Sequence, residues 1–318
     1  MPRPSEWTAA SACHPSDVTV VFHDDPFTPF DRQPLGDSPG SGPGFRRSVA
    51  VPDAYLPTSF DAARLRVGAR TLDPGQWVSQ RDDDWAPTIA MKRSLIAERP
   101  HEVVACVDGA GEACDEVAAG VLRSVGASPS HETGIDALVD AALHVADDLC
   151  ILIPGDDGIP RLAAAVLCSP NRWRLADKVG GTMAAIHRPV ARYDEDLDSP
   201  VNAVLARIHP DRSLWRINWG VSNHPSLFQP DIPPPTPGID AADMCFRVEW
   251  QTLRRLPVTG AILFTIRTYV ERMGDFATRD YAVLDDVADL ILKLEEKVAV
   301  YKSIAPYRDR LYEFLSAR

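Results

Sequence analysis

The chain has 318 residues, of which 45% are hydrophobic and 25% are charged, and its formal net charge is −12 at a pI near 5.1. This composition is typical of a globular chain with one large domain or two modest ones. The acidic balance disfavours nucleic acid and anionic membranes as partners, because both repel negative charge. No run approaches the roughly 20 apolar residues that span a bilayer, and the first residues lack an apolar signal core, so we expect a cytoplasmic protein.

The six cysteines contain no C-x-x-C pair, and no histidines follow them at zinc-finger spacing, so we expect reduced thiols. C-x-x-C-H, a G-x-G-x-x-G after a strand and a P-loop motif are also missing. If the protein takes part in redox chemistry, its nicotinamide, flavin and iron–sulfur cluster are therefore expected on another polypeptide.

In chain order, residues 1–50 are rich in Pro, Gly, Ser and Asp, which predicts an extended arm. Helical patterns follow in 51–134 and predict a helical N-terminal flank. LDPGQW has the features of a capped helix start, and WAPTIAMKRSLIAERP and CDEVAAGVLRSVG show helical spacing.

Residues 135–275 change character. IDALVDAALHVADD predicts a helix, and LCILIP and RLAAAVLC predict a hairpin of buried strands around a GDDG turn. LWRINWGVS and FRVEWQTLRRLP alternate apolar and polar residues, and GAILFTIRTYV completes a second hairpin after PVTG. Such short connections imply antiparallel pairing. Residues 225–238, PSLFQPDIPPPTPG, predict a long proline-stiffened loop.

Residues 276–318 predict C-terminal amphipathic helices. Five apolar residues at three-four spacing indicate one long helix that packs on the protein's own sheet: Leu284, Val287, Ile291, Leu294 and Val298. The patterns together indicate the α+β class, with a small antiparallel sheet between flanking N- and C-terminal helices.

One histidine stands out in the segment KVGGTMAAIHRPVAR. His187 follows a run of small and apolar residues and precedes Pro189 by two positions. On residue type alone it is an ordinary hydrogen-bonded histidine as readily as a metal ligand. The pattern leaves both interpretations open.

Several sequence blocks occur in a fixed order from about residue 71 to 270. They are LDPGQW, KRSLIAERPHEVV, DDLCILIP, VLCSPNRWRLADKVGG, AAIHRPV, WRINWGVS and EWQTLRRLPVTGAILFTIRTY. Together they resemble the haem-dependent oxidative N-demethylases, specifically the haem-carrying alpha subunit. The W-x-x-x-x-K-x-G, I-H-x-P-V, R-x-N-W and T-L-x-R-L-P patterns are specific as a set.

The resemblance implies a fold similar to PAS sensor domains, with a twisted antiparallel sheet, helices on one side and a haem pocket between them. It implies non-covalent haem b in a core at 135–275. It also implies a monooxygenase that uses dioxygen to remove a methyl group from a small secondary amine such as dimethylamine, releasing formaldehyde. Electrons would arrive from NADPH through flavin and iron–sulfur partner proteins. The alternative is a PAS-like sensor that binds haem or another small ligand without catalysis, because fold similarity does not separate the two.

His187 aligns with the histidine of the I-H-x-P-V block, so the resemblance makes it the axial iron ligand. Small residues before it would let a flat macrocycle approach the backbone, whereas Ala191 stands where the family often has a second proline. The rival donors are weaker candidates. Cys168 ends an apolar strand, where a cysteine is usually a core residue, and His144 is a plausible packing residue of a helix. His209 and His224 stand beside prolines in expected loops, and no spacing recommends Tyr193 or Tyr269.

Haem propionates need cationic partners, for which Arg216 is the first choice and Lys178 the second. Further candidates to bind the propionates are Arg254, Arg255 and Arg267. Trp219 is a candidate to line the haem pocket.

Glu249 aligns with an acidic position of the family and is the candidate that binds the substrate ammonium and takes its proton. Asn218 and Gln251 are candidates for hydrogen bonds to dioxygen or substrate. Strand alternation places Arg247, Glu249 and Gln251 on one face, but leaves open whether that face lines a pocket or meets solvent.

Overall fold

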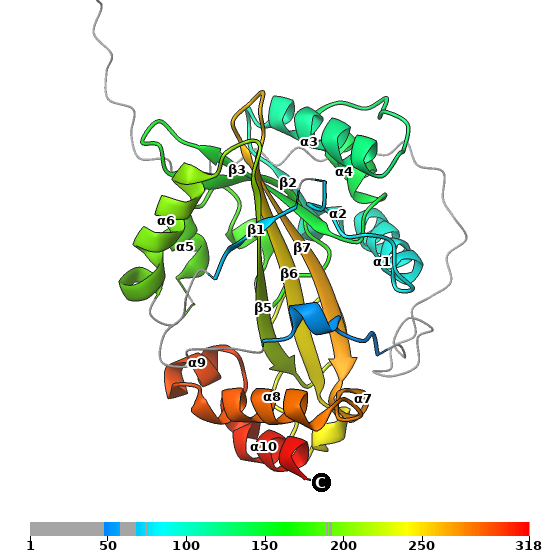
Figure 1. Cartoon of the computed structure of the whole chain (residues 1–318). Coiled ribbons are helices and arrows are strands. Elements are labelled where there is room, and N and C mark those ends of the chain that lie inside the picture. The colour runs from blue at the N-terminus through cyan, green and yellow to red at the C-terminus, as the bar shows by residue number, and fades with distance from the viewer. Residues whose placement is uncertain (1–47, 58–67, 74, 189, 191–192, 318) are drawn as a thin grey trace, which may run out of the picture.

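The protein is an α+β fold built around one open antiparallel sheet (Figure 1). The computed structural model describes residues 48–57, 68–73, 75–188, 190 and 193–317. The expected N-terminal arm therefore lies almost entirely outside the described residues. Within the described ranges, no helix is long and apolar enough to cross a membrane.

The sheet has seven strands in the order β1-β5-β6-β7-β3-β4-β2. The strands are β1 (Arg70–Leu72), β2 (Val104–Cys106), β3 (Asp148–Pro154), β4 (Pro160–Val166), β5 (Ser213–Ser222), β6 (Cys245–Arg255) and β7 (Ile262–Arg272). The hairpins β3–β4 and β6–β7 confirm the two predicted from the sequence. The proline-rich segment 225–238 is a loop, as predicted, because its prolines supply no backbone donors.

The helices lie around this sheet and at one end of it. They are α1 (Trp85–Glu98), α2 (Pro100–Val103), α3 (Gly111–Ser124), α4 (Gly134–Ala142), α5 (Met183–His187), α6 (Asp198–Arg207), α7 (Met273–Phe276), α8 (Tyr281–Lys293), α9 (Glu296–Tyr301) and α10 (Arg308–Ser316). Figure 1 shows α7 to α10 gathered beneath the end of the sheet where β5 and β7 finish.

Helices cover both faces of the sheet. On one face, odd-numbered β3 residues such as Leu149 and even-numbered β6 residues such as Trp250 join a large core with Val117 of α3 and Leu138 of α4. On the other, a smaller cluster joins other strand residues to Met183 of α5. The expectation of helices on one side is therefore wrong. The strands carry apolar residues on both faces of the sheet, so helices must shield each face from water.

The smaller cluster covers part of its face, and polar residues occupy the rest. Arg216 and Asn218 of β5 lie opposite Gln251 and Glu249 of β6, so these four side chains share that face. We call it the site face. The carboxylate of Glu249 is on the buried side of the molecule, with a residue exposure of 5%. Strand alternation left open whether the face with Glu249 meets solvent, and its burial shows that it does not.

Three local expectations are wrong. LDPGQW begins no helix among its described residues; β1 ends at Leu72, and the N–H of Gln76 donates to the carbonyl of Asp73 in a turn that includes Gly75 at φ +92°. The region 51–134 is not purely helical, because it supplies both edge strands, β1 and β2. Three-residue strands carry no periodic signal, so pattern analysis cannot find them.

The third correction concerns the C-terminal helix. The five spaced apolar residues are all buried as predicted, but the helix ends at Lys293, and Leu294 and Glu295 are extended before α9 begins. The turn redirects the chain so that the segment after α9 reaches the edge of β5. Tertiary packing overrides the sequence periodicity here.

Candidate functional site

His187 ends the short helix α5. The helix is capped by Thr182, whose Oγ1 accepts a hydrogen bond from the N–H of Ala185 at 3.3 Å. Nδ1 of His187 lies 2.9 Å from the carbonyl oxygen of Met183, and only the protonated Nδ1 can donate there. Nε2 has no hydrogen-bond partner among the described residues. The helix therefore presents a neutral imidazole with a free Nε2 lone pair.

The surroundings of His187 keep it neutral. Burial lowers its pKa from 6.5, the bond to Met183 opposes this, and the charge of Arg216 lowers the pKa further. Tyr193 stacks on the imidazole with a centroid separation of 4.7 Å and an interplanar angle of 5°. This contact fixes the plane of the ring.

Glu249 is the centre of a buried hydrogen-bond network on the site face. Its Oε1 accepts from Nδ2 of Asn171 at 2.9 Å. Its Oε2 accepts from Nδ2 of Asn218 at 3.2 Å and from Nε2 of Gln251 at 2.8 Å. Nε of Arg247 lies 3.8 Å from Oε1. Three amides and a guanidinium thus hold the carboxylate in one orientation.

More positive than negative charge surrounds this carboxylate. Arg172, Arg216 and Lys302 all interact electrostatically with Glu249. Burial lowers the pKa of each of these three cations, and that of Lys302 falls to about 7. Burial, followed by the charge of Glu249, raises the pKa of the Tyr301 hydroxyl.

Several polar atoms of this region are buried without a hydrogen-bond partner among the described residues. They include Nε of Arg172 and Arg216, Oδ1 of Asn171, Oε1 of Gln251 and the hydroxyl of Tyr193. Unpaired buried polar atoms cost free energy, and several gathered in one place indicate a missing polar partner. The donors among these atoms, on Arg172, Arg216 and Tyr193, suit an anion, whereas the amide oxygens of Asn171 and Gln251 accept and need a donor.

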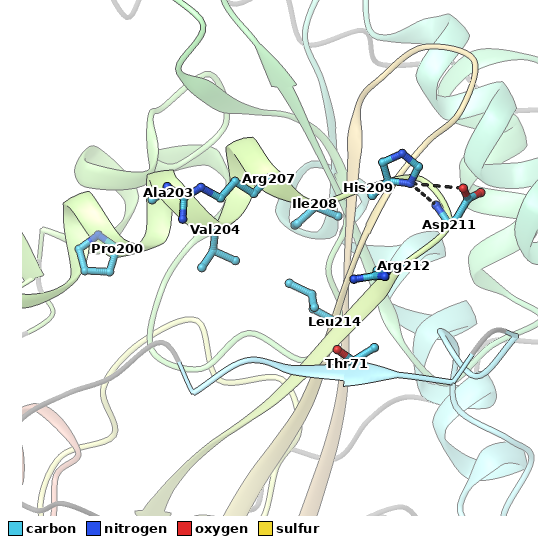
Figure 2. A pocket seen from close by; sticks show the side chains of 10 residues that line it. All are labelled: Thr71, Pro200, Ala203, Val204, Arg207, Ile208, His209, Asp211, Arg212 and Leu214. Atoms are coloured by element: carbon cyan, nitrogen blue, oxygen red, sulfur yellow. Dashed lines mark hydrogen bonds and ion pairs between the residues drawn. The ribbon is translucent and has the colours of Figure 1, made fainter.

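An open cavity of about 870 Å³ lies between α6, β1 and β5. Figure 2 shows Val204, Ile208 and Leu214 around it, with Arg207 and Arg212 at its margin. Leu214 precedes Arg216 by two residues on β5 and lies on the same face of the strand. None of the described residues that line the cavity belongs to the network around Glu249, and Leu214 is the link between the two along β5.

Residues 123–312 match the family model described as "Haem-dependent oxidative N-demethylase, alpha subunit-like". The chain belongs to this family. The match covers more than half of the chain and includes every residue named in the polar cluster. It confirms the family that the sequence blocks indicated.

The fold brings most of the predicted demethylase residues together. His187, Arg216, Asn218, Glu249 and Gln251 come from α5, β5 and β6, which are far apart in the sequence. Arg216 connects His187 of α5 with Glu249 of β6. Its charge lowers the pKa of His187, and it is attracted to the carboxylate of Glu249.

Other predicted residues are placed differently. Lys178 donates its Nζ to the carbonyl of Ile186 at 2.7 Å, where it caps the end of α5. Trp219 is 4% exposed and alternates onto the opposite face from Glu249. Gly181 serves a tight turn: a Cβ there would lie 2.9 Å from the Lys178 carbonyl oxygen. Pro189 and Ala191 lie outside the described residues.

The three further arginine candidates all have other contacts. Arg255 donates to the carbonyls of Leu205, Ile208 and Gly260, and Arg254 lies 5.1 Å from the Trp77 ring centroid. Arg267 pairs with Asp82 and Asp84.

The rival iron donors are also dispersed. Cys168 is fully buried, and burial raises its thiol pKa. His144 lies in a turn beyond α4, and His209 is exposed beside Asp211. Among the described residues, no three His, Cys, Asp or Glu side chains group as a metal centre.

Sequence reasoning missed five members of the cluster. Asn171 and Arg172 lie inside the block VLCSPNRWRLADKVGG, so that block was the available signal. Tyr193 was weighed as an iron donor rather than as the partner that stacks on His187. Tyr301 ends α9 and Lys302 follows it directly, a position where a lysine is normally a surface residue.

Proposed function

We propose that this chain is the haem-carrying catalytic subunit of a monooxygenase that removes a methyl group from a small secondary amine such as dimethylamine. The products are a primary amine and formaldehyde. Electrons come from NADPH through separate flavin and iron–sulfur proteins. Family membership supports the reaction class, and the position of Arg216, whose charge acts on both His187 and the buried Glu249, supports the assignment of residues.

The residues present fit haem b held without covalent attachment. His187 offers a neutral imidazole whose free Nε2 suits an iron ligand. The propionates are anions, and the cationic surplus with the unpaired Nε of Arg216 suits a carboxylate. The apolar side of the cavity at Val204 and Leu214 suits the edge of a macrocycle. Bound haem supplies the iron at which dioxygen is bound and reduced.

The chain's own residues have distinct parts in this proposal. His187 holds the iron, and Tyr193 fixes the ring of His187. Arg216 binds a propionate; Lys178 holds the end of α5 instead of a propionate. Trp219 contributes from the far face of β5 as the support on which Lys302 rests.

Glu249 binds the protonated amine and accepts its proton, because a buried carboxylate is the one negative side chain at the centre of the described cluster. Its two neighbours Asn218 and Gln251 hold it and provide hydrogen bonds to substrate or dioxygen. The burial that excludes water strengthens these electrostatic contacts. The open antiparallel sheet agrees with the PAS-like fold that the family implies, whereas the helices on both of its faces differ from it.

The observation that carries the proposal is the free Nε2 of His187, and haem uptake tests it. Wild type, His187→Ala and His144→Ala are expressed with haem supplied, and the Soret band and pyridine haemochrome content are compared. His144 is the matched control because it lies in a turn after α4, away from the cluster. We expect His187→Ala to lose the wild-type spectrum and His144→Ala to keep it. An unchanged spectrum and haem load in His187→Ala would exclude His187 as the ligand.

A further inference from the structure

Lys302 is buried against the free edge of β5. It follows α9 directly and is 6% exposed. β1 pairs with residues 213–215 of β5, and no other described strand pairs with the rest of that edge. Nζ of Lys302 donates to the carbonyl oxygen of Trp219 at 2.5 Å and lies 4.8 Å from the centroid of its ring. An accepting carbonyl and an aromatic face, both of Trp219, thus hold the side-chain amino group of Lys302 in place.

The same amine reaches the polar cluster through Asn218. Nζ of Lys302 donates to Oδ1 of Asn218 at 3.4 Å, and Nδ2 of Asn218 donates to Oε2 of Glu249 at 3.2 Å. An amide has one accepting and one donating end. Because a protonated lysine can only donate, its contact fixes which end of Asn218 faces Glu249. A reversed amide would point a carbonyl oxygen at a carboxylate.

Three charged groups face Lys302 from the neighbouring elements. Arg216 of β5 and Arg172 of the loop after β4 repel its positive charge, while Glu249 of β6 attracts it. Burial is the largest influence on the pKa of Lys302, and burial and these three charges together lower it to about 7. The charge on Lys302 therefore changes within the neutral range, two hydrogen bonds from Glu249.

We propose that Lys302 is a positioning residue of the amine site, which orients Asn218 and, through it, Glu249. The inference rests on the proposed function, since it assigns Glu249 to the amine. A protonated Lys302 donates a charge-assisted hydrogen bond to Asn218, whereas a neutral amine donates a weaker one. Through the orientation of Asn218, dimethylamine binding should therefore weaken as the pH rises through the neutral range. Repulsion between protonated Lys302 and the ammonium group acts in the opposite sense, so binding that strengthens with rising pH would overturn the inference.

The test uses haem-loaded protein and dimethylamine as the probe. The dissociation constant is taken from the change in the haem absorption spectrum at each pH from 6 to 8, where dimethylamine itself stays protonated. Lys302→Met removes the side-chain amino group of Lys302 and keeps its aliphatic stem. Lys92→Met is the matched control, because Lys92 is also fully buried, and its Nζ donates to the carbonyls of Val145 and Asp147, neither of which belongs to the hydrogen-bond network around Glu249. Asn218→Ala cuts the connection while keeping both ends.

We expect wild type and Lys92→Met to show the pH dependence. Lys302→Met and Asn218→Ala should lose it and bind dimethylamine about tenfold more weakly at pH 6, while haem load stays unchanged in all four proteins. Wild-type affinity and pH dependence in either Lys302→Met or Asn218→Ala would overturn the inference. If Lys302→Met does not fold, Asn218→Ala decides alone. A wild type that takes up no haem, or shows no response to dimethylamine, would refute the proposed function and the inference with it.

Discussion

Replacing Glu249 by glutamine tests the buried network most directly. The change keeps the shape of the side chain, removes its charge and turns one acceptor into a donor. The less disruptive orientation keeps the oxygen toward Asn218 and Gln251 and places the new NH₂ opposite Asn171. Oδ1 of Asn171 has no partner among the described residues, so a rotation of that amide restores the third bond.

The remaining cost is the loss of charge. A hydrogen bond to a charged group contributes about 1.5–3 kcal/mol, against about 0.5–1.5 kcal/mol for a neutral pair. The difference over the two retained bonds gives a loss of roughly 2–3 kcal/mol in the free energy of unfolding. If Glu249 binds the ammonium group, the lost charge-assisted bond also weakens dimethylamine binding by about one to two orders of magnitude.

Two measurements separate these effects. Urea unfolding of the haem-free protein gives the stability, and spectral titration of the haem-loaded protein gives the affinity for dimethylamine. Glu271→Gln is the matched control: Glu271 is also buried in the sheet, but it binds the backbone N–H of Val51 and the guanidinium of Arg279. We expect Glu271→Gln to lose stability and keep amine affinity.

A Glu249→Gln protein within about 0.5 kcal/mol of wild-type stability would refute the network as described. A destabilised variant with unchanged amine affinity would show that Glu249 serves the fold alone. Either result would redirect the search for the proton acceptor.

Two further predictions concern the frame around the site. Burial raises the pKa of Asp148 from 3.8 to about 6, so the folded state binds its proton more tightly and Asp148 favours folding less as the pH rises from 4 to 6. Asp148→Asn cannot titrate, so its unfolding free energy relative to wild type should rise by roughly 2–3 kcal/mol between pH 4 and 7. Urea unfolding at each pH measures it, and a constant difference would contradict the raised pKa. Gly181→Ala should cost about 1–3 kcal/mol in thermal unfolding, because its Cβ would lie 2.9 Å from a backbone oxygen of Lys178. Gly111→Ala, whose Cβ would lie 4.0 Å from its nearest neighbour, should cost nothing; equal melting temperatures in the two variants would refute the steric argument.

The sequence by itself determined the five longer strands and both hairpins. Period-two alternation and short Gly-containing turns are local signals, so they indicate strands and hairpins without knowledge of which distant segments pack on them. Alternation alone also placed Arg247, Glu249 and Gln251 on one face of β6, because side chains two residues apart on a strand point the same way. The sequence block around His187 singled it out from the other histidines.

The tertiary structure decided everything that depends on contact between distant segments. The edge strands β1 and β2 have three residues each and form because longer strands pair with them. The break between α8 and α9 lies within an unbroken apolar pattern, so the pattern alone predicts one helix. Whether Glu249 met solvent or a pocket depended on which loops and helices cover its face.

The same reason explains why the sequence did not indicate Lys302 as a site residue. A lysine after an amphipathic helix is normally solvated, since the desolvation of its charge is costly and nothing local repays it. Here the carbonyl of Trp219, the amide of Asn218 and the charge of Glu249 repay that cost, and all three lie more than fifty residues away in the chain. Whether a charged side chain can be buried depends on the partners that compensate its charge. For Lys302 those partners are distant in the sequence, so only the tertiary fold brings them together.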